Sequence, residues 1–236
     1  MVNCVKKRLN LAKKRFFMSK NIAVILSGCG HLDGSEIRES VIGLVALSEF
    51  GAEPHFFAPN VDESVINHNN NEQMGQKRNA LLESARISRG NIKDLSAAKM
   101  TNFDGIFFPG GSGAASVLCN FATKGVNAVA LPEVERIISE SLEQKKPIAA
   151  CCIAPALLAC ATNSLSPKLT LTLGATSSAS KTVESMGITH KECQANEIVC
   201  DNDRKVVTTP AYMSDASLFN ISVGVRKMIK QMIDWT

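Results

Sequence analysis

Apolar and polar positions alternate along this chain in blocks that predict strand and helix in turn from residue 21 onward. The predicted strands are Asn21–Leu26, Pro54–Ala58, Asp104–Phe108, the run from Pro147, Leu169–Leu173 and a hairpin of Glu197–Cys200 with Lys205–Thr208. The predicted helices are Ser35–Phe50, Lys77–Arg89, Pro132–Gln144, Lys181–Met186 and Asp215–Trp235. From Pro59 to about Gly75 the chain is polar and predicts a long loop. This order predicts one α/β domain over residues 18–236, with a mostly parallel sheet.

The charge of the chain is unevenly distributed. Its 26 Lys and Arg and 22 Asp and Glu give a net charge of +4. Residues 1–20 hold seven of the basic residues and no acid, so the remainder carries a net charge of −3. A slightly acidic body does not predict a nucleic-acid partner. No apolar run reaches the length of roughly 18 residues that a membrane helix needs.

Residues 1–17 form a basic extension outside the predicted core, and three explanations stay open. They are an organelle transit peptide, a start assigned too early with Met18 as the true one, or a basic arm for a membrane surface or RNA. The second is favoured, which places the protein in the cytoplasm, whereas a transit peptide would place it in mitochondria. The eight cysteines show no disulfide spacing, so we expect free thiols in a reducing compartment.

The strongest chemical signal is Cys152, between a buried strand that follows Pro147 and a helix that opens with Pro155. A thiol in this sharp turn faces the unpaired N–H groups of the helix start, which favour a thiolate. Cys151, as the last residue of the strand, has the features of an inert buried thiol. We therefore expect Cys152 to be a nucleophile.

Two other unusual loops also follow strands directly, and all three should open at the same edge of a parallel sheet. Pro109–Gly113 carries Gly110 and Gly111, whose backbone N–H groups are accessible to a developing oxyanion, with the N–H of Ile153 as a further donor. Ser27–Glu36 ends in a segment typical of a capping box, in which Glu36 caps its helix. The alternative is that the carboxyl of Glu36 points towards a neighbouring strand end.

These residues belong to a set of motifs that resembles the enhancing-lycopene-biosynthesis (ElbB) family, whose members are isoprenoid-biosynthesis proteins with an amidotransferase-like domain. The resemblance runs from about residue 20 to the C-terminus. Its motifs are Val24–Gly30 with Asp33–Glu36, Val65–His68, Arg78-Asn79, Ala85–Ile87, Arg89-Gly90, Pro109–Gly111, Cys152–Ala156 and Val207–Met213. The wider group resembled is the class I glutamine-amidotransferase-like superfamily, with its PfpI-type and Parkinson's-associated members.

The resemblance implies a flavodoxin-like sandwich, a nucleophile-elbow cysteine at Cys152, a partner carboxyl at Glu36 and a glutathione-independent glyoxalase-type conversion of glyoxal to glycolate. The wider superfamily also implies a homodimer. Superfamily relatives often place a histidine after the strand that follows the elbow, but Leu169–Ala175 contains none. Glutamine hydrolysis by a Cys–His–acid triad is therefore not expected.

The mechanism expected from these residues starts when the Cys152 thiolate adds to a small aldehyde. N–H groups near Gly111 and Ile153 hold the alkoxide, Glu36 moves a proton between the two carbons, and water releases the hydroxy acid. This chemistry requires no metal or organic cofactor. The competing hypothesis is a redox-sensing or regulatory binding protein, in which Cys152 is oxidised and glyoxalase activity is incidental.

Overall fold

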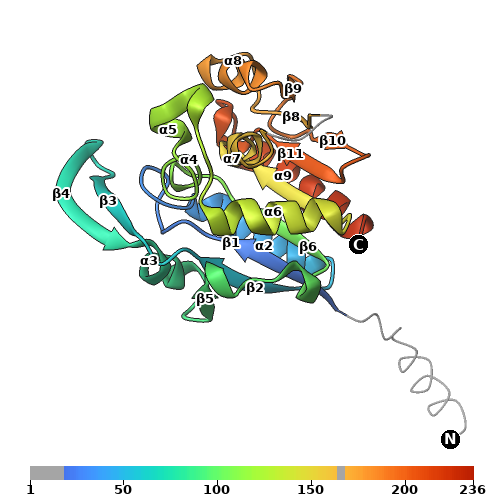
Figure 1. Ribbon diagram of the computed structural model, residues 1–236, viewed down its shortest axis with the longest axis horizontal. Helices are drawn as coiled ribbons and strands as arrows, with labels where there is room; N and C mark the ends of the chain where they lie inside the picture. The colour runs from blue at the N-terminus through green and yellow to red at the C-terminus, as the bar shows by residue number, and fades with distance from the viewer. Residues whose placement is uncertain (1–18, 164–167) are drawn as a thin grey trace, which may run out of the picture.

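A seven-stranded sheet organises the computed structural model, which describes residues 19–163 and 168–236 (Figure 1). The strand order is β10-β11-β7-β6-β1-β2-β5, and every neighbouring pair is parallel except β10 with β11. The strands are β1 (Lys20–Ile25), β2 (Ala52–Ala58), β5 (Ile92–Asp94), β6 (Gly105–Phe108), β7 (Ile148–Cys151), β10 (Val199–Asp201) and β11 (Val206–Thr209). The predicted mostly parallel α/β sandwich of flavodoxin-like type is confirmed.

Helices cover both faces of this sheet because alternate residues of its strands point to opposite sides. In β1, Ala23 and Ile25 enter one apolar core, whereas Ile22 and Val24 enter the other. The first core includes α4 (Gly113–Ser116), α5 (Phe121–Lys124), α6 (Pro132–Glu143), α7 (Ala154–Ala161) and α8 (Ser178–Ser185). The second includes α2 (Ile37–Glu49), α3 (Ala80–Ile87) and α9 (Leu218–Asp234). Short 3-10 turns are η1 (Leu95–Ala97), η2 (Met100–Asn102), η3 (Gly125–Asn127) and η4 (Ala211–Met213).

The long loop predicted from Pro59 to about Gly75 is wrong. The chain there forms β3 (Asp62–Asn67) and the first half of β4 (Glu72–Asn79), an antiparallel hairpin that projects from the body (Figure 1). Residues 72–78 are all exposed, so β4 has no apolar alternation for a sequence pattern to detect. The following helix accordingly begins at Ala80 and not at Lys77, with the side chain of Asn79 as its cap.

Two smaller differences concern short strands. β5 has three residues and was not predicted, because so short a strand carries no periodic signal. Of the strand predicted over Leu169–Leu173, only β8 (Thr170–Leu171) forms, and it pairs with β9 (Thr189–His190) outside the main sheet. The predicted hairpin of β10 with β11 and the closing helix are confirmed.

The register of the three central strands aligns the loops that carry the candidate chemistry. Phe108 of β6 lies opposite Ala150 of β7, and β1 and β6 are paired through Val24 and Phe107. The loops after β1, β6 and β7 therefore leave the sheet side by side. Within the described residues, no helix has both the length and the apolar character needed to cross a membrane.

Candidate active site

Cys152 lies directly after the end of β7 and is followed by Ile153, the N-cap residue of α7, so it occupies the turn between strand and helix that the sequence predicted. Its φ angle of 59° is in the left-handed region, which is uncommon for a residue with a side chain. The backbone N–H of Cys152 donates a hydrogen bond of 3.1 Å to the carbonyl of Thr209, which extends the β7–β11 pairing by one residue. Pro155 lies in the first turn of α7 and loses no helical hydrogen bond there. The sharp turn thus presents the thiol at the edge of the sheet, as in a nucleophile elbow.

Three hydrogen bonds hold the neighbouring loops together beside this turn. The N–H of Glu36 donates to the carbonyl of Gly110 at 2.8 Å, and that of Ser112 donates to His31 at 2.9 Å. The N–H of Gly113 donates to the carbonyl of Gly34 at 3.0 Å. These bonds join the loop after β1 to the loop after β6. The predicted convergence of the strand-end loops is therefore what the structure shows.

Glycine is required at position 110 because three groups crowd it. A Cβ atom there would lie 2.3 Å from Cβ of Cys152 and 2.4 Å from Oε2 of Glu39. Gly111 is equally constrained, with a φ of 98° and a position for Cβ only 2.3 Å from the carbonyl oxygen of Gly34. The two glycines let the β6 loop approach the cysteine through its backbone alone.

Glu36 is the N-cap residue of α2. Its Oε2 accepts a hydrogen bond of 2.6 Å from the N–H of Glu39, and its carbonyl accepts from the N–H of Ser40 at 3.0 Å. Glu36 therefore caps its helix, but the predicted capping box, in which Glu36 reaches back to an earlier cap residue, is wrong, because Glu36 occupies the cap position itself. Its side chain also lines the cavity that contains Cys152.

Glu39, one helical turn later, is the carboxyl that contacts the cysteines, and sequence reasoning missed it. It is fully buried. Oε2 accepts a hydrogen bond of 3.0 Å from the N–H of Gly110 and lies 3.6 Å from Sγ of Cys151. Oε1 accepts from the N–H of Tyr212 at 3.2 Å, and the carboxyl is near enough to Cys152 for its charge to add to the effect of burial in raising the pKa of that thiol. The sequence signal that could have identified Glu39 is its position three residues after Glu36, about one helical turn along the same helix.

Burial raises the pKa of Glu39 to about 7, and the nearby charge of Glu36 adds to this effect. The hydrogen bonds from Tyr212 and from both thiols act in the opposite direction, because they stabilise the carboxylate. The outcome is a carboxyl that exchanges its proton near neutral pH. A general acid–base group works best with such a pKa.

Cys152 does not have the lowered pKa that its helix-start position led us to expect. Burial and the charge of Glu39 raise the pKa of its thiol, and together they exceed the effect of the N–H groups of Gly111 and Ile153, which lower it. Burial likewise raises the pKa of the Cys151 thiol. The thiol of Cys152 and the carboxyl of Glu39 therefore form a pair in which one negative charge disfavours a second.

The predicted oxyanion donors divide into two groups. The N–H of Gly110 is taken by Glu39, so it is not available to a substrate. The N–H groups of Gly111 and Ile153 point at the sulfur of Cys152, and neither donates to a backbone carbonyl elsewhere in the described chain. These two N–H groups lie where charge would develop on an atom bonded to the sulfur.

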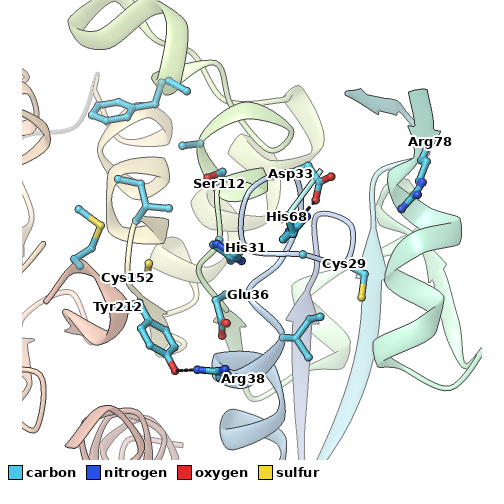
Figure 2. Close-up of a pocket in the computed structure, with 18 residues that line it drawn as sticks. Cys29, His31, Asp33, Glu36, Arg38, His68, Arg78, Ser112, Cys152 and Tyr212 are labelled. Atoms are coloured by element: carbon cyan, nitrogen blue, oxygen red, sulfur yellow. Dashed lines mark hydrogen bonds and ion pairs between the residues drawn. The ribbon is translucent and has the colours of Figure 1, made fainter. Parts of the chain in front are cut away.

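A cavity of about 980 Å³ opens over Cys152 (Figure 2). Cys152, Glu36, Tyr212 and Arg38 lie at one end of the view, and Cys29, His68 and Arg78 lie at the other. Its remaining lining residues are Gly30, His31, Asp33, Ile37, Gly111, Ser112, Ala115, Phe121, Ala122, Ile153 and Met213.

Two histidines line this cavity, and neither follows the strand after the elbow, where the superfamily often places one. The ring of His31 packs edge-on against that of His68, with centroids 4.9 Å apart. Nε2 of His68 lies 3.7 Å from Oδ1 of Asp33. His31 comes from the glycine-rich loop after β1, a position the sequence showed but which had no evident partner. The cavity thus contains two imidazole groups, but neither occupies the sequence position of the histidine in a Cys–His–acid triad of the superfamily.

Comparison with known proteins shows which family the chain belongs to. No family model matches the chain. It is 39% identical to the "ES1 protein homolog, mitochondrial" of Rattus norvegicus over 226 residues, which cover 91% of this chain and 84% of that protein. It is 38% identical to the human "Glutamine amidotransferase-like class 1 domain-containing protein 3, mitochondrial", with 91% of this chain and 83% of that protein covered.

Solved structures extend the comparison. The isoprenoid biosynthesis protein with amidotransferase-like domain from Ehrlichia chaffeensis superposes with a TM-score of 0.86 at 35% identity, covering 92% of this chain and 99% of that one. Glyoxalase III from Candida albicans shares the fold alone, with a TM-score of 0.58, 14% identity and 91% and 96% of the two chains covered. The chain therefore belongs to the family of ES1 proteins and isoprenoid-biosynthesis proteins with a class I glutamine-amidotransferase-like domain.

Proposed function

We propose that this protein is a glutathione-independent glyoxalase-type enzyme that converts glyoxal to glycolate through Cys152. The observation that carries the proposal is that a cavity-lining thiol and a buried carboxyl with a pKa near 7 lie close together, since both crowd the Cβ position of Gly110. The thiol supplies a nucleophile, and the carboxyl supplies a proton carrier at neutral pH. The fold shared with glyoxalase III supports the superfamily but not the particular reaction.

The reaction begins with transfer of the Cys152 proton to the carboxylate of Glu39 as sulfur adds to one aldehyde carbon. The resulting alkoxide accepts hydrogen bonds from the N–H groups of Gly111 and Ile153. Glu39 returns its proton to this alkoxide and, as a carboxylate again, takes the proton from the carbon bonded to sulfur and delivers it to the neighbouring carbon. The hydroxyl proton passes to the oxygen of that neighbouring carbon, which converts the hemithioacetal into a thioester of glycolate. Water cleaves the thioester, so glycolate leaves and the thiol is restored. Glu39 takes the proton-carrying role that the sequence suggested for Glu36.

The raised pKa of Cys152 argues against the competing role as an oxidation sensor. Peroxide reacts with thiolates, so redox-sensing cysteines generally have low pKa values. Burial and Glu39 instead keep this thiol protonated at neutral pH. Catalysis does not require a free thiolate in advance, because the Cys152 proton is transferred to Glu39 as the substrate reacts.

Glyoxal turnover by matched cysteine variants tests the proposal. Cys152→Ala should lower kcat/KM by more than about 1,000-fold, because it removes the nucleophile. Cys151→Ala is the control, since this neighbouring thiol is fully buried in the strand, and it should keep kcat/KM within about tenfold. Trapping a glycolyl adduct on Cys152 by mass spectrometry would identify the intermediate. Full turnover by Cys152→Ala would refute the proposal.

We also propose a mitochondrial location, in place of the cytoplasmic one favoured above. Two relatives have names that describe them as mitochondrial. Residues 1–17, which lie outside the described residues, contain basic residues and no acid, as transit peptides do. Import of the full chain into isolated mitochondria, with a version starting at Met18 as control, tests this location. Failure of the full chain to be imported would contradict this location, and equal import of both versions would contradict a transit-peptide role for residues 1–17.

A further inference from the structure

The cavity is larger than a two-carbon dialdehyde requires. Its volume of about 980 Å³ lies at the upper end of the range typical of sites for drug-sized ligands. Apolar side chains form part of its wall, among them Ile37, Ala115, Phe121 and Met213. A substrate that fills this space has a carbon chain beyond its reacting carbonyl. The charged groups on the cavity wall indicate which chemical group that chain carries besides the reacting carbonyl.

Arg38 is the cation placed at the same end of the cavity as Cys152 (Figure 2). Its Nη1 donates a hydrogen bond of 3.0 Å to the hydroxyl oxygen of Tyr212, and its guanidinium lies 6.0 Å from the centre of the tyrosine ring. The backbone N–H of Tyr212 is bonded to Glu39. One residue therefore fixes both the buried carboxyl and the guanidinium, so Arg38 is held in a defined place relative to the reacting thiol.

The guanidinium of Arg38 retains donors for a ligand. In the described part of the chain, no carboxylate lies within ion-pair distance of it. Glu36 is near enough to raise the pKa of Arg38 weakly, but one of its carboxylate oxygens is already used to cap α2. Arg226 shows the contrast, because it binds both carboxylate oxygens of Glu49 through two hydrogen bonds. An arginine has five donors, of which Tyr212 uses one.

We propose that the natural substrate is a 2-oxoaldehyde with an anionic oxygen group, a carboxylate or a phosphate, and that Arg38 binds this group. The inference rests on the proposed glyoxalase-type function and specifies its substrate class. A guanidinium recognises carboxylates and phosphates through paired hydrogen bonds, which it does not form with a neutral carbon chain. Arg78, at the other end of the cavity, lies 3.7 Å from Glu83 and is therefore less free to serve.

The chemistry balances without an added oxidant or reductant. The aldehyde carbon is oxidised to a carboxylate while the neighbouring ketone carbon is reduced to an alcohol, and one water molecule is consumed. The anionic group is unchanged by the reaction. Its role is to hold the chain so that the aldehyde carbon lies at Sγ of Cys152.

Substrate preference is the first test. The probes are 4,5-dioxopentanoate, which carries a carboxylate, hydroxypyruvaldehyde phosphate, which carries a phosphate, and 2-oxopentanal, which has a neutral tail. We expect the wild type to have a higher kcat/KM for an anionic probe than for 2-oxopentanal. Arg38→Met should reduce this ratio by roughly 10- to 100-fold, the effect of losing a charged hydrogen bond. Arg226→Met is the control, because Arg226 lies outside the cavity, and it should leave the ratio unchanged.

Binding in the absence of turnover separates this inference from the proposed function. Cys152→Ser protein is titrated by calorimetry with the product-like acids 2-hydroxyglutarate, 3-phosphoglycerate and 2-hydroxypentanoate. The inference is supported if 2-hydroxyglutarate or 3-phosphoglycerate binds more tightly than 2-hydroxypentanoate and this difference is lost in Cys152→Ser/Arg38→Met. Tighter binding of 2-hydroxyglutarate identifies a carboxylate as the anionic group, and tighter binding of 3-phosphoglycerate identifies a phosphate. Equal affinity for all three, or no effect of Arg38→Met, overturns it even if glyoxal is turned over. Failure of the wild type to convert any aldehyde overturns the proposed function and the substrate class with it, whereas binding of the acids that depends on Arg38 would still show an anion site in the cavity.

Discussion

The backbone N–H of Tyr212 donates a hydrogen bond of 3.2 Å to Oε1 of Glu39, and so joins the segment after β11 to the first turn of α2. The other oxygen of the same carboxyl accepts from Gly110 in the loop after β6 and lies beside Cys151 at the end of β7. Segments from four places in the sequence therefore converge on one buried carboxyl. The predictions below depend on the charge and position of this group.

Glu39→Gln should lower glyoxal kcat/KM by about 10²- to 10⁴-fold, because an amide keeps the shape of the side chain but carries no exchangeable acid proton. Glu36→Gln is the matched control in the same helix turn. It should weaken the cap of α2 by about 1 kcal/mol and keep kcat/KM within about tenfold. Steady-state kinetics and urea unfolding measure both effects. An inactive Glu36→Gln enzyme beside an active Glu39→Gln enzyme would return the proton-carrying role to Glu36.

The free energy of unfolding should fall as pH rises from about 4 to about 7. The pKa of Glu39 is about 7 in the folded protein, whereas an unfolded glutamate has a pKa of about 4.3. Between these two pKa values the folded state binds more protons than the unfolded state. The stability contributed by protonated Glu39 is therefore fully present below the lower pKa and is lost as pH rises through the higher one. The loss attributable to Glu39 is roughly 3 kcal/mol, to order of magnitude.

The Glu39→Gln variant isolates this contribution, because the buried carboxyl of Glu63, with a pKa raised to about 8, acts in the same direction in both proteins. Urea unfolding of wild type and variant at pH 4.5 and 7.5 provides the comparison. The variant should gain stability relative to the wild type as pH increases. A difference between the two proteins that does not change with pH would show that Glu39 titrates normally in the fold.

Cys152 should react more rapidly with iodoacetamide in Glu39→Gln than in the wild type at pH 7.5. Removing the carboxylate charge eliminates one cause of the raised thiol pKa, while the N–H groups of Gly111 and Ile153 remain to stabilise the thiolate. The variant would thus combine a more reactive thiol with a lower turnover. Peptide mass spectrometry at several times distinguishes Cys152 from Cys151. Slower alkylation in the variant would contradict the electrostatic account.

Gly110→Ala should abolish most activity and destabilise the fold by about 1–3 kcal/mol, because the new methyl group would overlap Cβ of Cys152 and Oε2 of Glu39. Gly51→Ala is the control for backbone strain. Gly51 has a φ of 73° with nothing within 4 Å of its Cβ position, so the substitution should cost about 1 kcal/mol and leave turnover intact. Thermal unfolding and glyoxal turnover measure the pair. Normal activity in Gly110→Ala would show that the loop tolerates displacement.

Local pattern was sufficient to predict a mostly parallel α/β sheet, the sharp turn at Cys152 and the meeting of three loops. An apolar run before Cys152 and Pro155 after it define strand and helix through short-range preferences, and parallel strands place their following loops at one edge. The β3–β4 hairpin was missed because this prediction depends on apolar periodicity, and the exposed residues of β4 show none. Its pairing depends on β3 and not on its own sequence.

Only the tertiary structure showed which of the two acids lies buried beside the cysteines and which caps the helix. Glu36 and Glu39 are both near the start of one helix, and a sequence does not show that the first caps the helix while the second turns inward to Gly110 and Tyr212. The pKa values of Glu39 and Cys152 follow from burial and from partners distant in the chain, so helix-start reasoning alone predicted a lowered thiol pKa where burial raises it. Strand and helix positions are set by neighbouring residues, whereas desolvation is set by the whole fold.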